Sequence, residues 1–239
     1  MHGVVLAAGR GTRLRPLTDD TPKALVDVAG EPILTRGLRR LVALGVDDLA
    51  VVVGYRGDQI RDRYGDRFEG VPVSYARQDD QKGLAHALLR AEHLVADDFL
   101  LVHGDNVFDP GADLERVVER HRETGPAATV LVERLSREAA AKTGVVRTDG
   151  DRVTGVVEKP DDPPSTLALT GLFALSPAVF HACHLVRPSE RGEYELSDAL
   201  DLLCRAGHPV ETVPLEGWRV NVNTPADRRE AARRLERNP

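Results

Sequence analysis

The chain of 239 residues contains little cysteine, few aromatic residues and no long hydrophobic run. Its only cysteines, Cys183 and Cys204, cannot form a disulfide framework, which predicts free thiols in a reducing compartment. No stretch approaches the roughly 20 apolar residues of a membrane helix. The first residues also lack the basic and apolar segments of a signal peptide. These absences predict a cytoplasmic protein that makes no membrane contact.

Positive charge is also scarce, since 32 basic residues stand against 38 acidic ones and give a net charge of −6. An acidic chain is a poor candidate for a general nucleic-acid binder, so no nucleic-acid partner is expected. A hydrophobic fraction of 41% with 29% charged residues is typical of a folded protein and argues against disorder. A local basic pocket can still hold anions. The basic residues include only four lysines: Lys23, Lys82, Lys142 and Lys159.

Short apolar runs alternate with amphipathic segments along the first half of the chain. Runs of this length with β-branched residues predict strands, and a stripe of helical period predicts helices. We expect strands at residues 4–8, 49–53, 71–76, 99–102 and 127–135, and helices at 33–44, 58–64, 83–95 and 112–123. The alternation of strand and helix favours a mainly parallel sheet covered on both faces.

The pattern changes in the second half of the chain, where Thr148-Asp149-Gly150-Asp151 separates two strand-like runs and predicts a hairpin. Further strands are expected at 167–175, 210–214 and 219–222, and helices near 177–183, at 195–206 and from Pro225 onward. No segment resembles a domain linker. The sequence therefore predicts one α/β domain over residues 1–239, a three-layer α/β/α Rossmann-like sandwich whose second half adds antiparallel strands.

A glycine-rich, basic loop follows the first expected strand. Gly9 and Gly11 allow the backbone to approach a ligand closely, and successive backbone N–H groups there can bind an anion. Arg13 and Lys23 add positive charge suited to phosphate. The loop matches neither common phosphate-binding motif, so its residues alone leave a basic surface turn open as an alternative.

The full segment LAAGRGTRLRPLTDDTPKALVDVAGEP resembles the nucleotide-binding signature of the sugar nucleotidyltransferases, or NDP-sugar pyrophosphorylases. The resemblance continues in family order through Gln78 before Gly83-Leu84-Ala85, Gly104-Asp105-Asn106, Gly144-Val145-Val146, Glu158-Lys159-Pro160, Thr170-Gly171-Leu172 and Asn221-Val222-Asn223-Thr224-Pro225. Within the family the chain is most similar to the short glucose-1-phosphate uridylyl- and thymidylyltransferases. The resemblance implies a nucleotidyltransferase fold of the GT-A type, with residues 1–110 binding nucleotide and 111–239 binding sugar phosphate. It also implies that a nucleoside triphosphate, UTP or dTTP by preference, reacts with a sugar-1-phosphate to give an NDP-sugar and pyrophosphate.

The resemblance further implies a role for individual residues. Arg13, Lys23, Asp105 and Lys159 are expected to be catalytic, and Asp105 and Asn221 to bind Mg²⁺. Many relatives carry Asp at the position of Asn221, so Asn223 stays open as the second ligand, with N-capping of the last helix as its alternative role. The nucleotide is expected to contact Leu6, Ala8, Gly9, Gly11, Thr12, Arg13, Lys23, Gln78, Gly83 and Asp105. The sugar phosphate is expected to contact Gly144, Glu158, Lys159, Thr170 and Gly171.

Two other functions are compatible with the same residues. Short relatives transfer a cytidylyl group to other phosphorylated alcohols, and an inactive nucleotide-sugar-binding subunit would share the scaffold. The presence of all the catalytic residues favours an enzyme. The base among uracil, thymine and cytosine, the sugar, an allosteric site and a homo-oligomeric state are left open.

Overall fold

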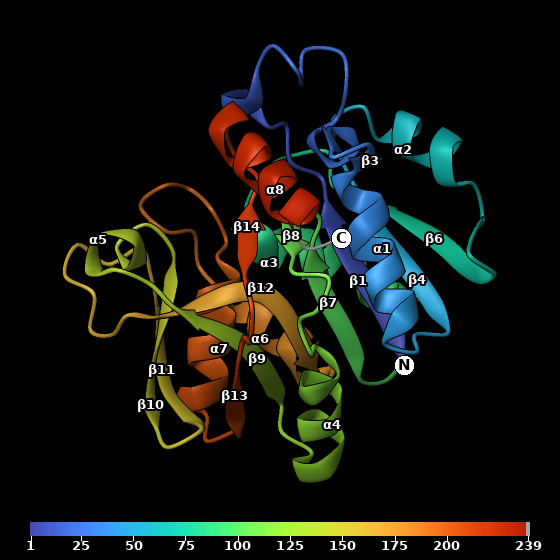
Figure 1. Ribbon diagram of the computed structural model, residues 1–239. Helices are drawn as coiled ribbons and strands as arrows, with labels where there is room; N and C mark the ends of the chain where they lie inside the picture. Colours follow the sequence, from blue (N-terminus) through green and yellow to red (C-terminus); the bar gives the residue numbers. More distant parts are fainter. Residues whose placement is uncertain (238–239) are drawn as a thin grey trace.

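The apolar runs of the sequence form a central ten-stranded sheet in the computed structural model, which describes residues 1–237 (Figure 1). The strand order is β10-β11-β13-β9-β12-β7-β1-β4-β6-β5. The strands of this sheet are β1 (His2–Ala7), β4 (Asp48–Val53), β5 (Arg67–Phe68), β6 (Val71–Arg77), β7 (Phe99–His103), β9 (Ala128–Arg134), β10 (Gly144–Asp149), β11 (Arg152–Glu158), β12 (Leu167–Leu175) and β13 (Val210–Pro214).

The sheet is parallel from β7 through β1 and β4 to β6, is closed at that edge by the antiparallel β5, and is mixed in the other half. Strand β1 pairs in parallel with β4 and β7, and β4 pairs in parallel with β6. Strand β12 then runs antiparallel between β7 and β9, and thereby joins the two halves into one sheet. The expected hairpin is β10 and β11, paired antiparallel. The prediction of a mainly parallel mixed sheet with added antiparallel strands is confirmed.

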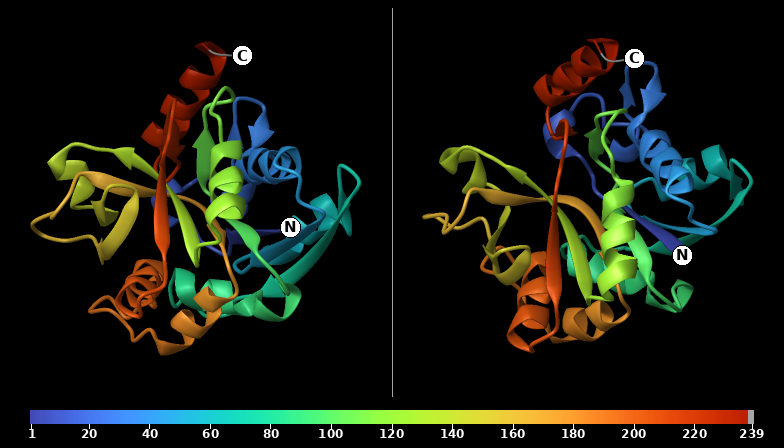
Figure 2. Two further views of the ribbon diagram at one scale, coloured as in Figure 1. Left: turned by 90° about the horizontal axis from the view of Figure 1, so that it is seen from below. Right: turned by 60° about the horizontal axis from the view of Figure 1, so that its bottom comes forward.

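Helices cover both faces of this sheet (Figure 2). They are α1 (Ile33–Ala43), α2 (Gly57–Tyr64), α3 (Leu84–Arg90), α4 (Glu115–Thr124), α5 (Arg137–Ala140), α6 (Ala178–Leu185), α7 (Leu196–Arg205) and α8 (Pro225–Arg237). Leu38 of α1 and Val117 of α4 are fully buried in the core on one face, whereas Leu88 of α3 and Leu200 of α7 are buried in the core on the other. The three-layer α/β/α sandwich is therefore confirmed. None of the helices within residues 1–237 is long and apolar enough to cross a membrane.

Two expected helices are shorter in the structure than in the prediction. The helix expected over 83–95 ends at Arg90 and continues as the 3-10 turn η3 (Glu92–Leu94), with Ala91 fully buried between them. The helix expected from residue 112 begins at Glu115, because Asp109 holds a turn before it by accepting a hydrogen bond from the Gly111 N–H at 3.0 Å. Both errors arise where packing or a local turn overrides helical periodicity.

Several short elements escaped prediction, and they lie close to the cleft described below. The 3-10 turns η1 (Thr12–Leu14) and η2 (Lys23–Leu25) shape the glycine-rich loop, and a small hairpin of β2 (Asp27–Val28) and β3 (Glu31–Pro32) follows it. A second small sheet pairs β8 (Asn106–Phe108) with β14 (Arg219–Asn221). Pairings of two or three residues leave too little pattern for periodicity to reveal.

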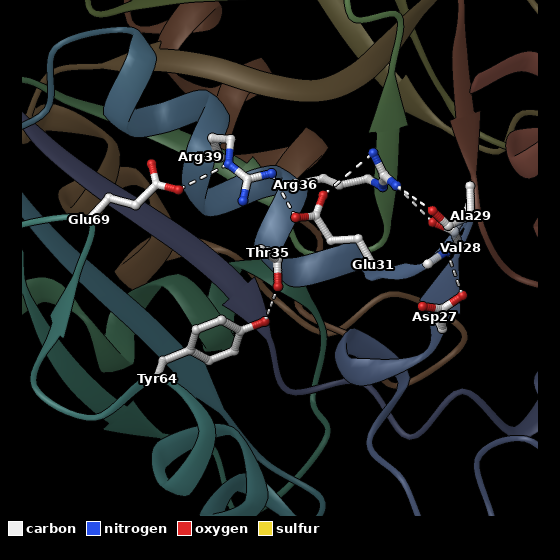
Figure 3. A network of polar contacts seen from close by, with 10 residues as sticks. Asp27, Val28, Ala29, Glu31, Thr35, Arg36, Arg39, Tyr64 and Glu69 are labelled. Carbon is white, nitrogen blue, oxygen red and sulfur yellow. Dashed lines mark hydrogen bonds and ion pairs between the residues drawn. The ribbon is translucent and has the colours of Figure 1, made fainter. Parts of the chain in front are cut away.

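Arginines of α1 fix the β2–β3 hairpin, as Figure 3 shows. Arg36 donates to the Val28 carbonyl oxygen at 2.8 Å, and Arg39 donates to Glu31 at 2.6 Å and to Glu69 at 3.0 Å. Because the hairpin directly follows η2, these contacts also hold the turn that carries Lys23 against the sheet.

Candidate active site

A cavity of about 990 Å³ opens where the parallel strands β1 and β7 reach their carboxyl ends. This edge of an open α/β sheet is the usual place for a ligand. Both halves of the chain line the cavity. Among the predicted site residues it is lined by Leu6, Ala8, Gly9, Arg13, Lys23, Gln78, Gly83, Asp105, Gly144, Glu158, Lys159, Thr170, Gly171 and Asn221. Gly11 and Thr12 lie in the same loop but do not line it.

A chain of hydrogen bonds joins four of the residues that line the cavity. The Lys23 Nζ donates to Asp105 Oδ2 and to Asn223 Oδ1, each at 2.7 Å. The Asn223 amide in turn donates to Asn221 Oδ1 at 2.8 Å. Segments that are far apart in the sequence thus place one lysine, one carboxylate and two amides in direct contact.

Two short pairings position Asp105 and Asn221 beside each other. The Gly104 N–H donates to the Leu6 carbonyl oxygen at 2.9 Å, which attaches the turn after β7 to the end of β1. The antiparallel pairing of β8 and β14 places Asn221 opposite Asn106, and the Val222 N–H donates to the Asp105 carbonyl oxygen at 2.8 Å. The small β8–β14 sheet therefore brings the closing segment of the chain to the strand-end carboxylate.

The charge of Asp105 is stabilised within this cluster. Burial is the largest single influence and raises the pKa of Asp105. The adjacent Lys23 ammonium, together with His103 and Arg219, outweighs burial and leaves the pKa below its usual value. Asp105 Oδ1 is buried, and no group within residues 1–237 donates a hydrogen bond to it. Burial lowers the pKa of the neighbouring His103 to about 4, so this imidazole is neutral near pH 7.

The structure assigns the cap of the last helix to residues other than Asn223. The Asp227 carboxylate accepts hydrogen bonds from the backbone N–H of Asn223 at 3.0 Å and of Thr224 at 2.7 Å. The Thr224 hydroxyl accepts from the Asp227 N–H at 3.2 Å, which completes a reciprocal capping arrangement. The alternative role of Asn223 as the N-cap is therefore wrong, and its side chain belongs to the Lys23 cluster.

The two expected cations of the nucleotide loop differ in their surroundings. Lys23 is buried in the cluster with Asp105, whereas Arg13 lies exposed on η1 at the cavity rim. Arg13 forms no ion pair within the part of the chain that the structure describes. An arginine that lines a cavity without a protein partner is available to bind an anionic ligand.

Gln78 and Gly83 lie together at another wall of the cavity. Gln78 is 4% exposed, and its amide nitrogen donates to the Gly83 carbonyl oxygen at 3.1 Å. Gly83 has a φ of +96°, and a Cβ at this position would lie 2.5 Å from the Tyr194 carbonyl oxygen. Only glycine fits here, because both the backbone conformation and the contact with the 194 segment exclude a side chain.

The expected sugar-phosphate residues gather around β11. Glu158 accepts a hydrogen bond from the Ser197 hydroxyl at 3.0 Å and forms an ion pair with Lys159 at 3.3 Å. Gly144 lies directly beside the Glu158 carboxylate, and a Cβ at this position would lie 3.0 Å from Glu158 Oε2 and crowd it. The Thr170 hydroxyl is buried and donates to the Leu131 carbonyl oxygen at 2.9 Å. Thr170 therefore lines the cavity, but its hydroxyl hydrogen is already used in a hydrogen bond within the protein.

Beyond the predicted set, the cavity is also lined by Gln81, Arg219 and Ser197. Arg219 forms a partly buried ion pair with Glu133 and donates to Asn106 at 2.9 Å. Arg219 and Asn221 are two positions apart on β14, so strand alternation could have placed both on the cavity side. Gln81 donates to the Ala8 carbonyl oxygen at 2.8 Å, and no sequence pattern predicts that contact.

Comparison with known proteins gives a consistent picture. The family model described as nucleotidyl transferase matches residues 2–236. The UTP--glucose-1-phosphate uridylyltransferase AglF of Haloferax volcanii is 51% identical over 99% of this chain and 97% of that protein. A glucose-1-phosphate thymidylyltransferase of Streptomyces antibioticus is 38% identical over 98% of this chain and 65% of that protein.

Solved structures share the fold. A UDP-glucose pyrophosphorylase complexed with UDP-glucose superposes with a TM-score of 0.91 at 24% identity, over 100% of this chain and 99% of the other. A UTP-bound UGPase from Acinetobacter baumannii superposes with a TM-score of 0.85 at 25% identity, over 98% of this chain and 92% of the other.

Proposed function

The chain belongs to the nucleotidyl transferase family, and from that premise we propose that it is a sugar-1-phosphate nucleotidyltransferase. The enzyme joins a nucleoside triphosphate, with UTP or dTTP preferred, to glucose-1-phosphate and releases pyrophosphate. The observation that carries the proposal is the single cavity in which both predicted sets of residues meet, the nucleotide set of the first half and the sugar-phosphate set of the second.

The reaction transfers a nucleotidyl group in one displacement. A phosphate oxygen of the sugar-1-phosphate forms a bond to the α-phosphorus, while the bridging oxygen between the α- and β-phosphates leaves with its electron pair as pyrophosphate. The protein must hold two anions close together and stabilise the charge that moves onto the leaving group.

The nucleotide occupies the part of the cavity lined by the glycine-rich loop. The exposed Arg13 binds the phosphates that leave, and Lys23 stabilises the α-phosphate from its fixed position beside Asp105. Gln78 faces the edge of the base, which lies on the backbone of Gly83. The buried position of Lys23 supports this assignment, because a desolvated cation stabilises a nearby developing charge more strongly than an exposed one.

The sugar phosphate occupies the part of the cavity around β11. Lys159 binds its phosphate, and the Glu158 carboxylate accepts hydrogen bonds from the sugar hydroxyls beside Gly144 and Gly171. The Ser197 hydroxyl orients Glu158 through the contact at 3.0 Å. The ion pair of Lys159 with Glu158 is half-exposed and 3.3 Å long, so a phosphate can replace the carboxylate as partner.

The residues around Asp105 fit Mg²⁺. Asp105 Oδ1 is a buried carboxylate oxygen that accepts no hydrogen bond from residues 1–237, and the Asn221 amide oxygen is close by in the same cluster. Mg²⁺ prefers oxygen ligands of this kind together with phosphate and water oxygens. We propose Asp105 and Asn221 as its protein ligands; when bound there, the ion would neutralise charge on the triphosphate.

Both cysteines in the described part of the chain are free thiols, in keeping with a proposed cytoplasmic location. No disulfide between them therefore needs to be formed before the enzyme is assayed.

Pyrophosphate release tests the proposed function. The protein is incubated with Mg²⁺, glucose-1-phosphate and UTP, dTTP, CTP, ATP or GTP in turn. We expect UTP and dTTP to give the highest kcat/KM, because a purine is too large for the site and would leave the buried Gln78 amide poorly paired. The expected preference for UTP and dTTP over ATP and GTP is about tenfold or more. Preference for CTP would indicate a cytidylyltransferase. An absence of pyrophosphate with every nucleotide would contradict the proposal and favour a binding subunit.

A further inference from the structure

The side chain of Gln78 is held by two contacts on one atom. Its amide nitrogen, Nε2, lies 3.1 Å from the Gly83 carbonyl oxygen and 2.9 Å from Nδ1 of His86, one turn further along the chain in α3. A carbonyl oxygen can only accept hydrogen bonds, so the atom that faces Gly83 must be the nitrogen. The other amide atom, Oε1, is left for the cavity and has no hydrogen-bond partner within residues 1–237.

The orientation of the amide fixes the protonation of His86. Since Gln78 Nε2 donates to Nδ1, Nδ1 must carry a lone pair, and the neutral imidazole holds its hydrogen on Nε2. Arg90 Nη2 lies 3.0 Å from that Nε2 and can only donate, so this contact cannot be a hydrogen bond in the same state. Arg90 is exposed and can turn into solvent, whereas Gln78 is buried. The contact between Arg90 and His86 is therefore lost, and the hydrogen bond between Gln78 and His86 is kept.

The opposite orientation has a buried conflict instead. If His86 carried its hydrogen on Nδ1, the amide would turn so that Oε1 accepted it, and Oε1 would face the Gly83 oxygen at about the same separation. Two acceptors in contact without a hydrogen between them repel each other, and a buried unpaired polar group costs about 1–3 kcal/mol. The arrangement with Nε2 toward Gly83 is therefore the stable one.

We propose that His86 is a specificity-determining positioning residue, which holds the Gln78 amide so that only its carbonyl oxygen faces the nucleotide base. This inference rests on the proposed function. Uracil and thymine present an N3–H donor to such an acceptor, whereas cytosine presents an unprotonated N3. With the amide nitrogen committed to Gly83 and His86, Gln78 cannot turn to donate to cytosine N3. The pair thus favours bases with an imide N–H over cytosine.

The same arrangement makes the preference depend on the charge of His86. A protonated imidazole has no lone pair on Nδ1, so it would turn the amide and present Nε2 to the base. The charged groups around His86 are Arg90 on its own helix and Asp80 and Lys82 on the loop before α3, while the Tyr194 ring packs at 6.3 Å. Burial, followed by Arg90 and Lys82, lowers the pKa of His86 below 6.5, so the imidazole is neutral at pH 7.5.

The test compares UTP with CTP in three variants, His86→Leu, His86→Asn and Arg90→Gln. Two quantities are measured at pH 7.5: kcat/KM with glucose-1-phosphate, and the Kd of each Mg²⁺-nucleotide by calorimetry without sugar phosphate. In His86→Leu we expect the UTP-to-CTP ratio to fall about tenfold, through weaker UTP binding and with little change in kcat. In His86→Asn the Oδ1 atom can accept at the position of Nδ1, so the ratio is retained. Arg90→Gln also retains it, because the Arg90 contact is absent from the productive state.

Three results would overturn the inference: an unchanged ratio in folded His86→Leu, an equal loss in His86→Asn, or a loss in Arg90→Gln. If His86→Leu does not fold, a pH series replaces it. The ratio of the unmodified enzyme should fall as the pH is lowered from 7.5 through the pKa of His86, which burial places below 6.5, while that of His86→Asn stays constant; parallel profiles across that pKa would contradict the proposal. If the enzyme releases no pyrophosphate, the proposed function fails, but the ratio of the two Kd values still tests the role of His86.

Discussion

Lys23 and Lys159 mark the two ends of the cleft, and the fold holds them in different ways. The Lys23 side chain is 11% exposed and makes two contacts of 2.7 Å, with Asp105 and Asn223. The Lys159 side chain is 40% exposed and makes one contact of 3.3 Å, with Glu158. The first lysine is fixed and desolvated before any ligand arrives, whereas the second can exchange partners at little cost because exposed pairs contribute about 0–1 kcal/mol.

This difference suggests a division of tasks within the cleft. A fixed, buried cation suits the reacting phosphorus, where charge must be stabilised without rearrangement. A mobile, exposed cation suits a substrate that enters and leaves through the open side. If this comparison is right, substitutions at the buried end should reduce turnover and stability together, and those at the exposed end should reduce only substrate use.

The largest effect is expected from Asp105→Asn. The substitution removes the carboxylate that pairs with Lys23 and that we propose as the Mg²⁺ ligand, so turnover should fall about a thousandfold. The measurement is kcat with Mg²⁺ at saturating substrates, with circular dichroism to confirm folding. Undiminished turnover by the folded variant would show that the buried end of the cleft is not where the reaction takes place.

Lys23→Met and Lys159→Met form a matched pair for the comparison. Lys23→Met leaves Asp105 as a largely buried, unpaired charge, and we expect the free energy of unfolding to fall by about 2 kcal/mol and kcat by about a hundredfold. Lys159→Met should leave the free energy of unfolding within about 0.5 kcal/mol of the original value. Urea denaturation measures the free energy of unfolding of both variants. Equal losses of that free energy in the two variants would contradict the difference between the two ends.

Arg13→Ala and Lys159→Ala test whether the two ends bind two different anions. Each variant loses one charge-assisted contact with a phosphate, worth about 1.5–3 kcal/mol or roughly ten- to hundredfold in kcat/KM. The loss should fall on the nucleoside triphosphate for Arg13→Ala and on the sugar phosphate for Lys159→Ala. Steady-state kinetics with each substrate varied in turn decides, and a loss on the same substrate in both variants would refute the two-pocket description.

The smallest effect is expected from Asn221→Asp. A carboxylate oxygen can replace the amide oxygen as a ligand of Mg²⁺, so turnover should stay within about threefold of the original value. Asn223→Ala provides the contrast, because it removes a hydrogen-bond partner of Lys23 at 2.7 Å. A complete loss of activity in Asn221→Asp would point to Asn223 as the second metal ligand.

The sequence predicted the architecture and most of the residues that line the cavity better than the contacts among those residues. Apolar runs and helical stripes located every strand of the main sheet except the two-residue β5, and most helices, because these elements are long enough to show a period. The two-residue strands β2 and β3 and the three-residue β8 were missed for lack of such a period. Strand β8 matters because it pairs Asn106 with Asn221 and so closes the site.

Contacts between distant segments could not be predicted from residue types. The pairing of Lys23 with Asp105 joins positions 82 residues apart, and its bond to Asn223 joins positions 200 apart. The capping motif offered Asn223 as a plausible N-cap, yet the Thr224–Asp227 pair performs that role. The orientation of the Gln78 amide likewise depends on Gly83 and His86 together, and neither residue alone determines it.

The central claim, that the two halves of the cleft join a nucleotide to a sugar phosphate, is tested most directly by identifying the products. The protein is incubated with Mg²⁺, UTP and glucose-1-phosphate, and the phosphorus resonances are followed over time. We predict that UDP-glucose and pyrophosphate appear in equal amounts, and that neither forms when glucose-1-phosphate is omitted. Formation of UMP and pyrophosphate without the sugar phosphate, or no consumption of UTP in its presence, would contradict the account.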